Sequence, residues 1–470
     1  MATSEGDITL TAANTVAEQD VGIHAAGDLS IRSGQDTLGN ANTSQSKAIG
    51  TVQISDTEKF SGWHRQQHED DSAQVSQVAS NIGSLGGNVN LSAGGSYSQI
   101  ASNVVAAQDI NITATSIELL TADETGHSSQ RDDDLRIGAF ARVKSPLIDL
   151  INNVDAARQS DGRLQQMQGM AAAANAYQAA SAIAAVSGAG GSGTLAAAEA
   201  GIGFKSASSS ADSHSVVSQG STLQAGGNLN LTSTGGDIHV VQGNLSAGNS
   251  LSLDSAGDIL LEAGKSQLAD RSKSSNAGVE VGMGASVGAQ TGVYAYAEAS
   301  VGSSRSNATS STWHNTTLSG QQISLQAAGD TTLRGATATA DRIDVTTGGT
   351  HTIESLQDVA QSESKNSQVG GRVQVSFGTA WDVSGYASGG KADGNYQAVG
   401  EQSGLFAGDG GYHVQAGHVN LVGGAIASTN AGNSELSAQT LTFSDLHNSM
   451  EHQASSGSIS GGFGGAAGDY

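Results

Sequence analysis

A short pattern of hydrophobic and polar positions recurs along the chain. It consists of glycine or glutamine, a small polar residue, and then an aliphatic, a polar and a second aliphatic residue. The two aliphatics fall on one face of an extended segment, so each copy predicts a short β-strand, and the Gly-Asp or Gly-Asn before it predicts a positive-φ turn. Examples are Gly6-Asp7-Ile8-Thr9-Leu10, Gly27-Asp28-Leu29-Ser30-Ile31, Gly227-Asn228-Leu229-Asn230-Leu231 and Gly257-Asp258-Ile259-Leu260-Leu261.

The copies recur every 20 to 22 residues, with shorter steps such as the nine residues from Leu229 to Ile238. One such strand buries nothing alone, but equivalent aliphatics stacked about 4.8 Å apart in successive coils form continuous ladders. The period predicts an all-β fold, a parallel β-helix or solenoid, right-handed by analogy with other parallel crossovers. A leucine-rich repeat has a similar period, but its Leu-x-x-Leu-x-Leu pattern is missing. The diagnostic spacings are Ile8 to Leu29, Val89 to Ile110, Ile238 to Ile259, Ile323 to Ile343 and Val419 to Leu441.

Long segments interrupt the repeats of this single solenoid, which we take to span residues 1–470. In the third segment, Val279, Val281 and Met283 share one face opposite Glu280, and Val293 to Val301 repeats the alternation with Glu298 on its polar face. The fourth does so with Val373, Val375 and Phe377, returning through Trp381 and Val383. This alternation predicts long, one-sided β-hairpins that project from the solenoid. The interrupting segments are 38–85, 120–220, 262–320, 354–416 and 445–470.

The second insertion also carries a helical pattern at its tip, over residues 145–187. Ser145-Pro146 reads as an N-cap followed by proline at the first helical position, and Leu147, Leu150, Ile151 and Val154 then fall at helical spacing. A second, alanine-rich helix is predicted from about Leu164 to Val186. The flanking segments, 135–143 and 195–204, are predicted to be the two legs of a hairpin.

Charge and composition exclude several functions. With 20 basic and 44 acidic residues the net charge is −24, and there is no basic run, so the chain repels phosphate backbones and has no polybasic anchor for anionic lipid. We therefore expect no nucleic-acid partner. The absence of cysteine excludes disulfides, thiolate metal sites and thiol nucleophiles. No run of 18 apolar residues and no signal-peptide pattern is found.

Candidate chemical sites are few, and we expect no catalytic residue, cofactor or metal. His64 and His68 would share a helical face beside Glu69, Asp70 and Asp71, but they lie in a polar insertion. Asp132-Asp133-Asp134 is compatible with a cation site or with a solvated hairpin base. Gly188 to Gly193 matches a dinucleotide fingerprint by letter, yet it follows a helix, which favours a linker. Polysaccharide cleavage would need clustered carboxylates on the coils, where Thr, Ser, Asn and Gln predominate.

The hairpins support a sharper hypothesis. Val279 to Gly288 is ten residues, which is the length of a tilted strand that spans a bilayer, and alternating apolar and small polar faces are typical of outer-membrane strands. In that interpretation Tyr294 and Tyr296, near the turn, would lie at the membrane interface. A hairpin lying flat on the solenoid would need the same alternation, so packing against neighbouring hairpins and disorder stay open as alternatives to membrane engagement.

The repeat phrase, the serine-rich insertions and the pairs Trp63-His64 and Trp313-His314 resemble the haemagglutinin repeats of filamentous haemagglutinin-type, two-partner-secreted bacterial exoproteins. The stretch from Ser145 to Val154, with the run from Gln168 to Tyr177, is similar to the second, membrane-facing repeat region of contact-dependent growth inhibition proteins. The resemblance covers nearly all of the chain.

This resemblance implies an extracellular fibre on the surface of a Gram-negative bacterium, exported through a dedicated outer-membrane transporter. It further implies that the fibre engages the outer membrane, surface proteins or glycans of a target cell, so that a C-terminal toxin is translocated. An adhesin or spacer stalk without membrane insertion is the alternative, and the hairpins would also suit self-association. The sequence begins within a repeat at Gly6-Asp7 and stops within an insertion at Gly461-Gly462-Phe463, so we expect a segment of a longer protein.

Overall fold

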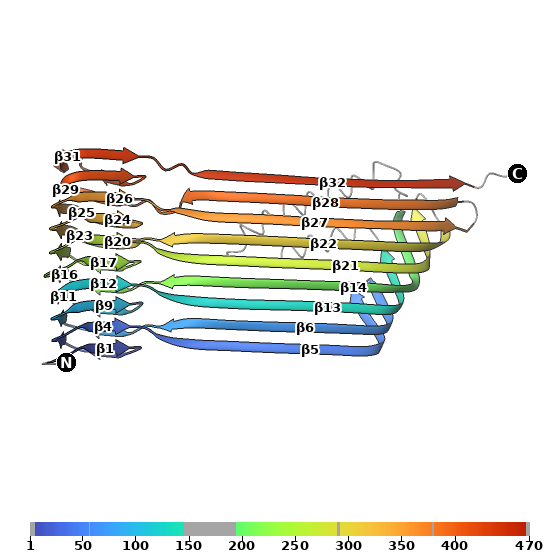
Figure 1. Cartoon of the computed structure of the whole chain (residues 1–470), viewed down its shortest axis with the longest axis horizontal. Coiled ribbons are helices and arrows are strands. Elements are labelled where there is room, and N and C mark those ends of the chain that lie inside the picture. Colours follow the sequence, from blue (N-terminus) through green and yellow to red (C-terminus); the bar gives the residue numbers. More distant parts are fainter. Residues whose placement is uncertain (1–4, 56, 145–193, 289–291, 378–379, 467–470) are drawn as a thin grey trace.

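Short strands wind into a solenoid, and long strands project from it to form a second sheet (Figure 1). This computed structural model describes residues 5–55, 57–144, 194–288, 292–377 and 380–466. Within these ranges the chain forms strands β1 to β32 and one 3-10 helix, η1 (Ala431–Asn433). The predicted all-β solenoid with projecting hairpins is confirmed. The predicted helical tip, 145–187, lies outside the described residues.

Each coil of the solenoid contributes three strand positions, and equivalent positions pair in parallel as three ladders. The first ladder holds β1 (Ile8–Thr11), β4 (Leu29–Arg32), β9 (Ser96–Ile100), β12 (Ser116–Leu120), β17 (Ile238–Val241), β20 (Ile259–Glu262), β24 (Thr331–Arg334), β26 (Thr350–Glu354) and the last parts of β29 (Gly404–Val422) and β31 (Glu435–Ser444).

The other two ladders follow it in every coil. The second holds β2 (Asn14–Ala17), β7 (Asn81–Ser84), β10 (Asn103–Ala106), β15 (Thr222–Ala225), β18 (Asn244–Ala247), the first parts of β23 (Thr316–Ala327), β25 (Ala336–Thr347) and β29, and β30 (Ala425–Ser428). The third holds β3 (Val21–Ala25), β8 (Val89–Ala93), β11 (Ile110–Ala114), β16 (Leu229–Ser233), β19 (Ser250–Ser255) and later parts of β23, β25, β29 and β31.

The predicted spacings are strand registers. Ile8 pairs with Leu29, Val89 with Ile110, Ile238 with Ile259, Ile323 with Ile343 and Val419 with Leu441. The nine-residue step from Leu229 to Ile238 joins two ladders of one coil, because β16 and β17 are successive strands. Leu229, Leu251 and Ile323 are fully buried above one another, so each aliphatic contributes to one continuous core.

The glycines of the repeat phrase have a different role from the predicted one. Among the described copies only Gly6 has positive φ, at 97°. At Gly349, a Cβ would instead overlap Oδ1 of Asp330, which crosses the glycine to accept a hydrogen bond from the Thr350 N–H at 2.7 Å. Glycine is needed there because the aspartate of one coil passes over the next coil. The same hydrogen bond, in which the aspartate Oδ1 accepts from a backbone N–H of the adjacent coil, recurs in five other places. The acceptor and donor residues are Asp7 and Asp28, Asp28 and Ser96, Asp109 and Asn228, Asp237 and Asp258, and Asp258 and Asp330.

The long strands leave the solenoid at one corner, between the first and second ladders, in every second coil. They pair antiparallel as a nine-stranded sheet, called here the hairpin sheet. Two strands occupy about 9.6 Å, and so do two coils, which lets successive hairpins join edge to edge without a gap. Its strands are β5 (Gly34–Ser55), β6 (Glu58–Val78), β13 (Ala122–Lys144), β14 (Thr194–Gln219), β21 (Gly264–Gly288), β22 (Gly292–His314), β27 (Gln357–Ser376), β28 (Ala380–Val399) and β32 (Ser449–Ala466).

Candidate functional site: the two faces of the hairpin sheet

The outer face of the hairpin sheet is defined by Val279, Val281 and Met283 of β21, whose side chains are 56%, 46% and 53% exposed. Residues directly opposite in a sheet point to the same side, so the strand registers place the exposed apolar side chains of eight strands on this face. We call them the apolar band: Ile49, Ile137, Val143, Ile202, Phe204, Val279, Val281, Met283, Val293, Val301, Val369, Val373, Val375, Phe377, Trp381, Val383, Ile459 and Phe463.

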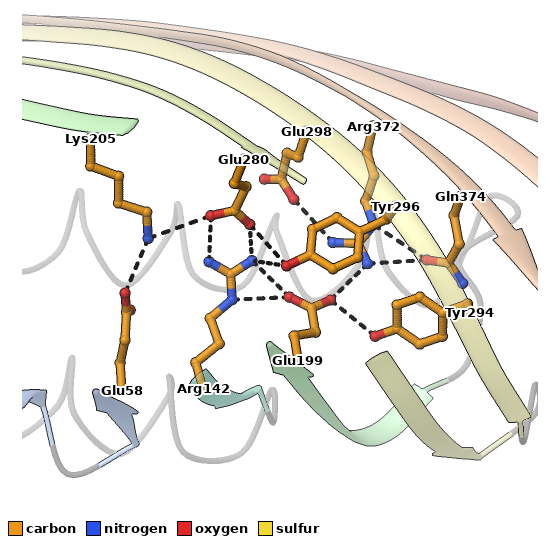
Figure 2. Close-up of polar contacts among 10 residues, drawn as sticks. All are labelled: Glu58, Arg142, Glu199, Lys205, Glu280, Tyr294, Tyr296, Glu298, Arg372 and Gln374. Atoms are coloured by element: carbon orange, nitrogen blue, oxygen red, sulfur yellow. Dashed lines mark hydrogen bonds and ion pairs between the residues drawn. The ribbon is translucent and has the colours of Figure 1, made fainter. Parts of the chain in front are cut away.

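The opposite, inner face carries a buried network of charged side chains (Figure 2). Arg142 of β13 lies at its centre. Its Nε donates to Glu199 at 2.9 Å, and its Nη1 donates to Glu280 at 2.9 Å. Both carboxylates are almost fully buried, with 2% and 6% of their side chains exposed. One guanidinium therefore joins strands from two different hairpins.

Arg372 of β27 extends the network to a third hairpin. Its Nη2 donates to the other oxygen of Glu199 at 2.7 Å, and its Nη1 donates to Glu298 at 3.0 Å. The Tyr294 hydroxyl donates to Glu199 at 3.0 Å, and that of Tyr296 donates to Glu280 at 3.4 Å. Glu199 thus binds two arginines and a tyrosine, which compensates for its removal from water.

A small aromatic core supports these ion pairs. Phe60, Phe140, Tyr294 and Tyr296 form a buried cluster on the inner face. The Arg142 guanidinium lies 4.8 Å from the Phe140 ring centroid, and that of Arg372 lies 4.0 Å from the Tyr296 centroid, which are favourable cation–π distances.

Lys205 closes the network at its other end. Its Nζ lies 3.2 Å from Glu58 and 3.7 Å from Glu280. The network of charged side chains therefore extends from β6 to β27.

The network shifts the pKa values of its members. Burial, followed by the negative charge of Glu199, raises the pKa of the Tyr294 hydroxyl to about 12. Burial also raises the pKa of Tyr296. For Arg142, burial lowers the pKa, but the hydrogen bonds to Glu280 and Glu199 outweigh it and the net shift is upward. At neutral pH the arginine is charged and the tyrosines are protonated donors. This chemistry holds strands together rather than activating a nucleophile.

The histidine candidates lie on a strand. His64 and His68 are four residues apart on β6, roughly 13 Å along it, so they do not share the helical face considered for them. His68 is bonded instead to Asp132 and Asp70, each at 2.5 Å, and the hydrogen bonds to these two groups raise its pKa. Asp134 pairs with Arg136. Across the described ranges, no group of three or more His, Cys, Asp or Glu is placed to hold a metal ion.

The tyrosine prediction was wrong. Tyr294 and Tyr296 point to the inner face and are 3% and 4% exposed, because their positions alternate with the apolar residues of β22. The glycine run 188–193 lies outside the described residues. Trp313-His314 ends β22, whereas Trp63-His64 lies inside β6.

Sequence reasoning noted Glu280 and Glu298 but missed Arg142, Glu199 and Arg372. A signal was present: near the tips of β14, β21, β22 and β27, a charged residue interrupts the alternation on the polar face of the strand. Pairing these charges required the registers between hairpins.

In the described part of the chain, no helix has the length and apolar character needed to cross a membrane.

Comparison with known proteins places the chain. It matches the hemagglutinin repeat family over residues 1–55, 61–194 and 202–371. It is 35% identical to the deoxyribonuclease CdiA of Dickeya dadantii (strain 3937), over 84% of this chain and 12% of that protein. It is 32% identical to the toxin CdiA of Yersinia pestis, over 97% of this chain and 14% of that protein. It is 33% identical to the tRNA nuclease CdiA of Escherichia coli (strain NC101), over 98% of this chain and 15% of that protein.

The chain thus spans only about one seventh of the length of these relatives. No solved structure matches it. Because the family match covers most of the chain, and includes three of the hairpins together with the coils between them, the chain belongs to the hemagglutinin repeat family.

Proposed function

We propose that this chain is a delivery segment of a secreted bacterial surface fibre, and that its hairpin sheet engages the outer membrane of a target cell so that a toxin elsewhere in the full-length protein can cross. The observation that carries the proposal is the apolar band. Its side chains are exposed across neighbouring hairpins, whereas Glu199 of β14 and Glu280 of β21, near the same end of the strands, are buried on the inner face. A continuous exposed apolar surface of this kind is typical of a contact site for protein or membrane.

Lipid is the occupant that the band favours. Exposed apolar surface costs about 25 cal/mol per Å² in water, and acyl chains remove that cost without demanding a complementary shape. Apart from β5 and β32 at its edges, every strand of the sheet is paired on both sides, so the backbone groups of the central strands stay satisfied where the outer face contacts lipid, whereas the two edges need to remain in water.

The relatives support a delivery role. Their names give different activities, deoxyribonuclease for one and tRNA nuclease for another, although this region is about equally similar in both. Because proteins that cleave different nucleic acids share this region, we infer that it does not determine which nucleic acid is cleaved. We place the chain in a fibre exported to the surface of a Gram-negative bacterium through a dedicated outer-membrane transporter, with a target-cell membrane as its partner and no catalysis of its own.

Vesicle flotation tests the proposal. The chain should float with vesicles of outer-membrane lipids. Val281→Asn/Val373→Asn changes two residues of the apolar band on either side of Ala297 and should weaken the association about tenfold or more. The matched control is Leu85→Asn/Val105→Asn, which changes exposed apolar residues of the solenoid and should float like the wild type.

A wild-type chain that stays with the soluble fraction would show that the sheet does not engage lipid. An adhesin or spacer stalk would then be the better interpretation, and sedimentation of the same samples would reveal whether the apolar band joins two copies instead.

A further inference from the structure

A row of cations crosses the outer face of the hairpin sheet. Lys273, Arg305, Lys365 and Lys391 occupy directly paired positions on β21, β22, β27 and β28. Arg131 lies in the same row on β13, with Ser210 of β14 between it and Lys273. We call these five residues the cation row. It is assembled from three hairpins of a chain that has only 20 basic residues and no basic run.

Repulsion within the cation row is only partly offset by the fold: Glu69 of β6 occupies the position directly opposite Arg131, at one end of the row. Side chains directly opposite in an antiparallel pair have Cβ atoms about 5 Å apart, and like charges there are destabilising. Within the described residues, Lys273, Arg305 and Arg131 form no ion pair. Lys365 pairs with Glu363 at 2.9 Å and Lys391 with Asp393 at 2.5 Å, but these are exposed pairs, which contribute little and exchange readily.

The surface around the row is hollowed. A shallow, open groove of about 1010 Å³ is lined by all five cations and by serines of the adjoining positions, such as Ser275, Ser303 and Ser367. Guanidinium, ammonium and hydroxyl groups are the donors that bind phosphate oxygens in proteins. The groove therefore offers several anion-binding donors side by side.

The row borders the apolar band. Arg305 is four residues from Val301 on β22, and Lys365 is four residues from Val369 on β27, about 13 Å in each case. One row of small side chains, including Ser303 and Ser367, separates them. An apolar surface followed by cations is the order in which a membrane presents acyl chains and then phosphates.

We propose that the cation row binds the phosphate groups of anionic lipids at the surface of the membrane that the apolar band contacts. This inference rests on the proposed function and names the headgroup that the sheet recognises. Because row and band share one face, a single membrane satisfies both, whereas a soluble polyanion would leave the band exposed.

The experiment compares two kinds of vesicle at low salt. One is phosphatidylcholine alone, and the other is phosphatidylcholine and phosphatidylglycerol at a ratio of roughly 3:1. The wild type should bind the anionic vesicles more tightly. Lys273→Gln/Arg305→Gln should lose about fivefold for each cation, roughly 25-fold together, on anionic vesicles only. Arg32→Gln/Arg334→Gln removes the same charge from the solenoid and should bind like the wild type. Added salt should weaken the anionic increment.

The outcomes separate the two proposals. Equal binding to both vesicles, or an anionic increment that survives Lys273→Gln/Arg305→Gln, overturns the headgroup assignment and leaves membrane engagement standing. Binding to anionic vesicles alone, lost in that variant, supports the cation row and contradicts engagement through the apolar band. No binding to either vesicle overturns both.

Discussion

The Arg142 guanidinium donates to both carboxylate oxygens of Glu280, a residue 138 positions further along the chain and on the next hairpin. The bond crosses β14, where Glu199 accepts from the same arginine. Three strands are thus joined by one buried cation. Edge-to-edge pairing aligns the hairpins, and this network fixes them to one another through side chains.

Replacing Arg142 should destabilise the hairpin sheet selectively. Arg142→Met leaves Glu199 and Glu280 buried without their shared cation, at a cost of about 3–5 kcal/mol. All three tryptophans, Trp63, Trp313 and Trp381, lie on hairpin strands, so tryptophan fluorescence during chemical denaturation reports this sheet.

The matched control for this test is Arg136→Met, which breaks the more exposed pair with Asp134 and should cost less than about 1 kcal/mol. Equal midpoints for the two variants would show that the buried network does not hold the sheet together.

The solenoid should lose stability in mild acid through His351. This residue is fully buried in the first ladder, between Thr331 and Val419, and its Nδ1–H donates to the Thr331 carbonyl at 3.1 Å. Burial lowers its pKa to about 4 from an ordinary value near 6.5. As the pH falls below about 6.5, His351 is therefore protonated in the unfolded chain but not in the folded chain. The free energy of unfolding should fall by about 2 kcal/mol between about pH 7.5 and pH 5.

Circular dichroism during denaturation at the two pH values measures this loss. His351→Leu, which restores the aliphatic found in other coils of the ladder, should show a smaller acid shift, since the remaining carboxylates titrate alike in both proteins. An identical shift in the variant would rule out His351 as the cause.

Gly349 and Asp330 should be energetically coupled. Gly349→Ala places a Cβ against Asp330 Oδ1, and overpacking of this kind costs about 1–3 kcal/mol. Asp330→Ala loses the bond to the Thr350 N–H, at about 1–2 kcal/mol. In the double variant the overlap is gone, so its loss should fall short of the sum by about 1 kcal/mol or more. Simple additivity in denaturation midpoints would contradict the role assigned to the corner glycine.

Deleting one hairpin should split the hairpin sheet and spare the solenoid. Joining Ala263 to Asn315 removes β21 and β22 and leaves a two-residue link, like Ala101-Ser102 between β9 and β10. The coils can still stack, but β14 and β27 are then separated by about two further strand spacings, near 9.6 Å, and each loses its partner on one side.

Hydrogen exchange should accelerate in β14 and β27, while β16 and β19 in the solenoid keep their protection. Retained protection of β14 would show that hairpin spacing is not set by the coils.

The coil period, the five strand registers and the one-sided hairpins follow from the sequence alone, because each depends on residues close together or on strict repetition. Aliphatics 20 to 22 residues apart have few ways to be buried other than by stacking, as Ile8 and Leu29 do. Alternation along β21 likewise separates Val281 from Glu280 without reference to any other segment.

Which face is exposed, and which charges meet, depends on the tertiary structure. The alternation does not determine that Glu280 is buried and Val281 exposed, because an isolated hairpin buries neither face. Arg142, Glu199 and Arg372 meet only because two strands and two coils have the same width, which sets the register between hairpins. The same register assembles the cation row from residues scattered over 260 positions, from Arg131 to Lys391, in a chain without a basic run. Local pattern decides what each strand contains, and only the stacking of hairpins decides what lies beside it.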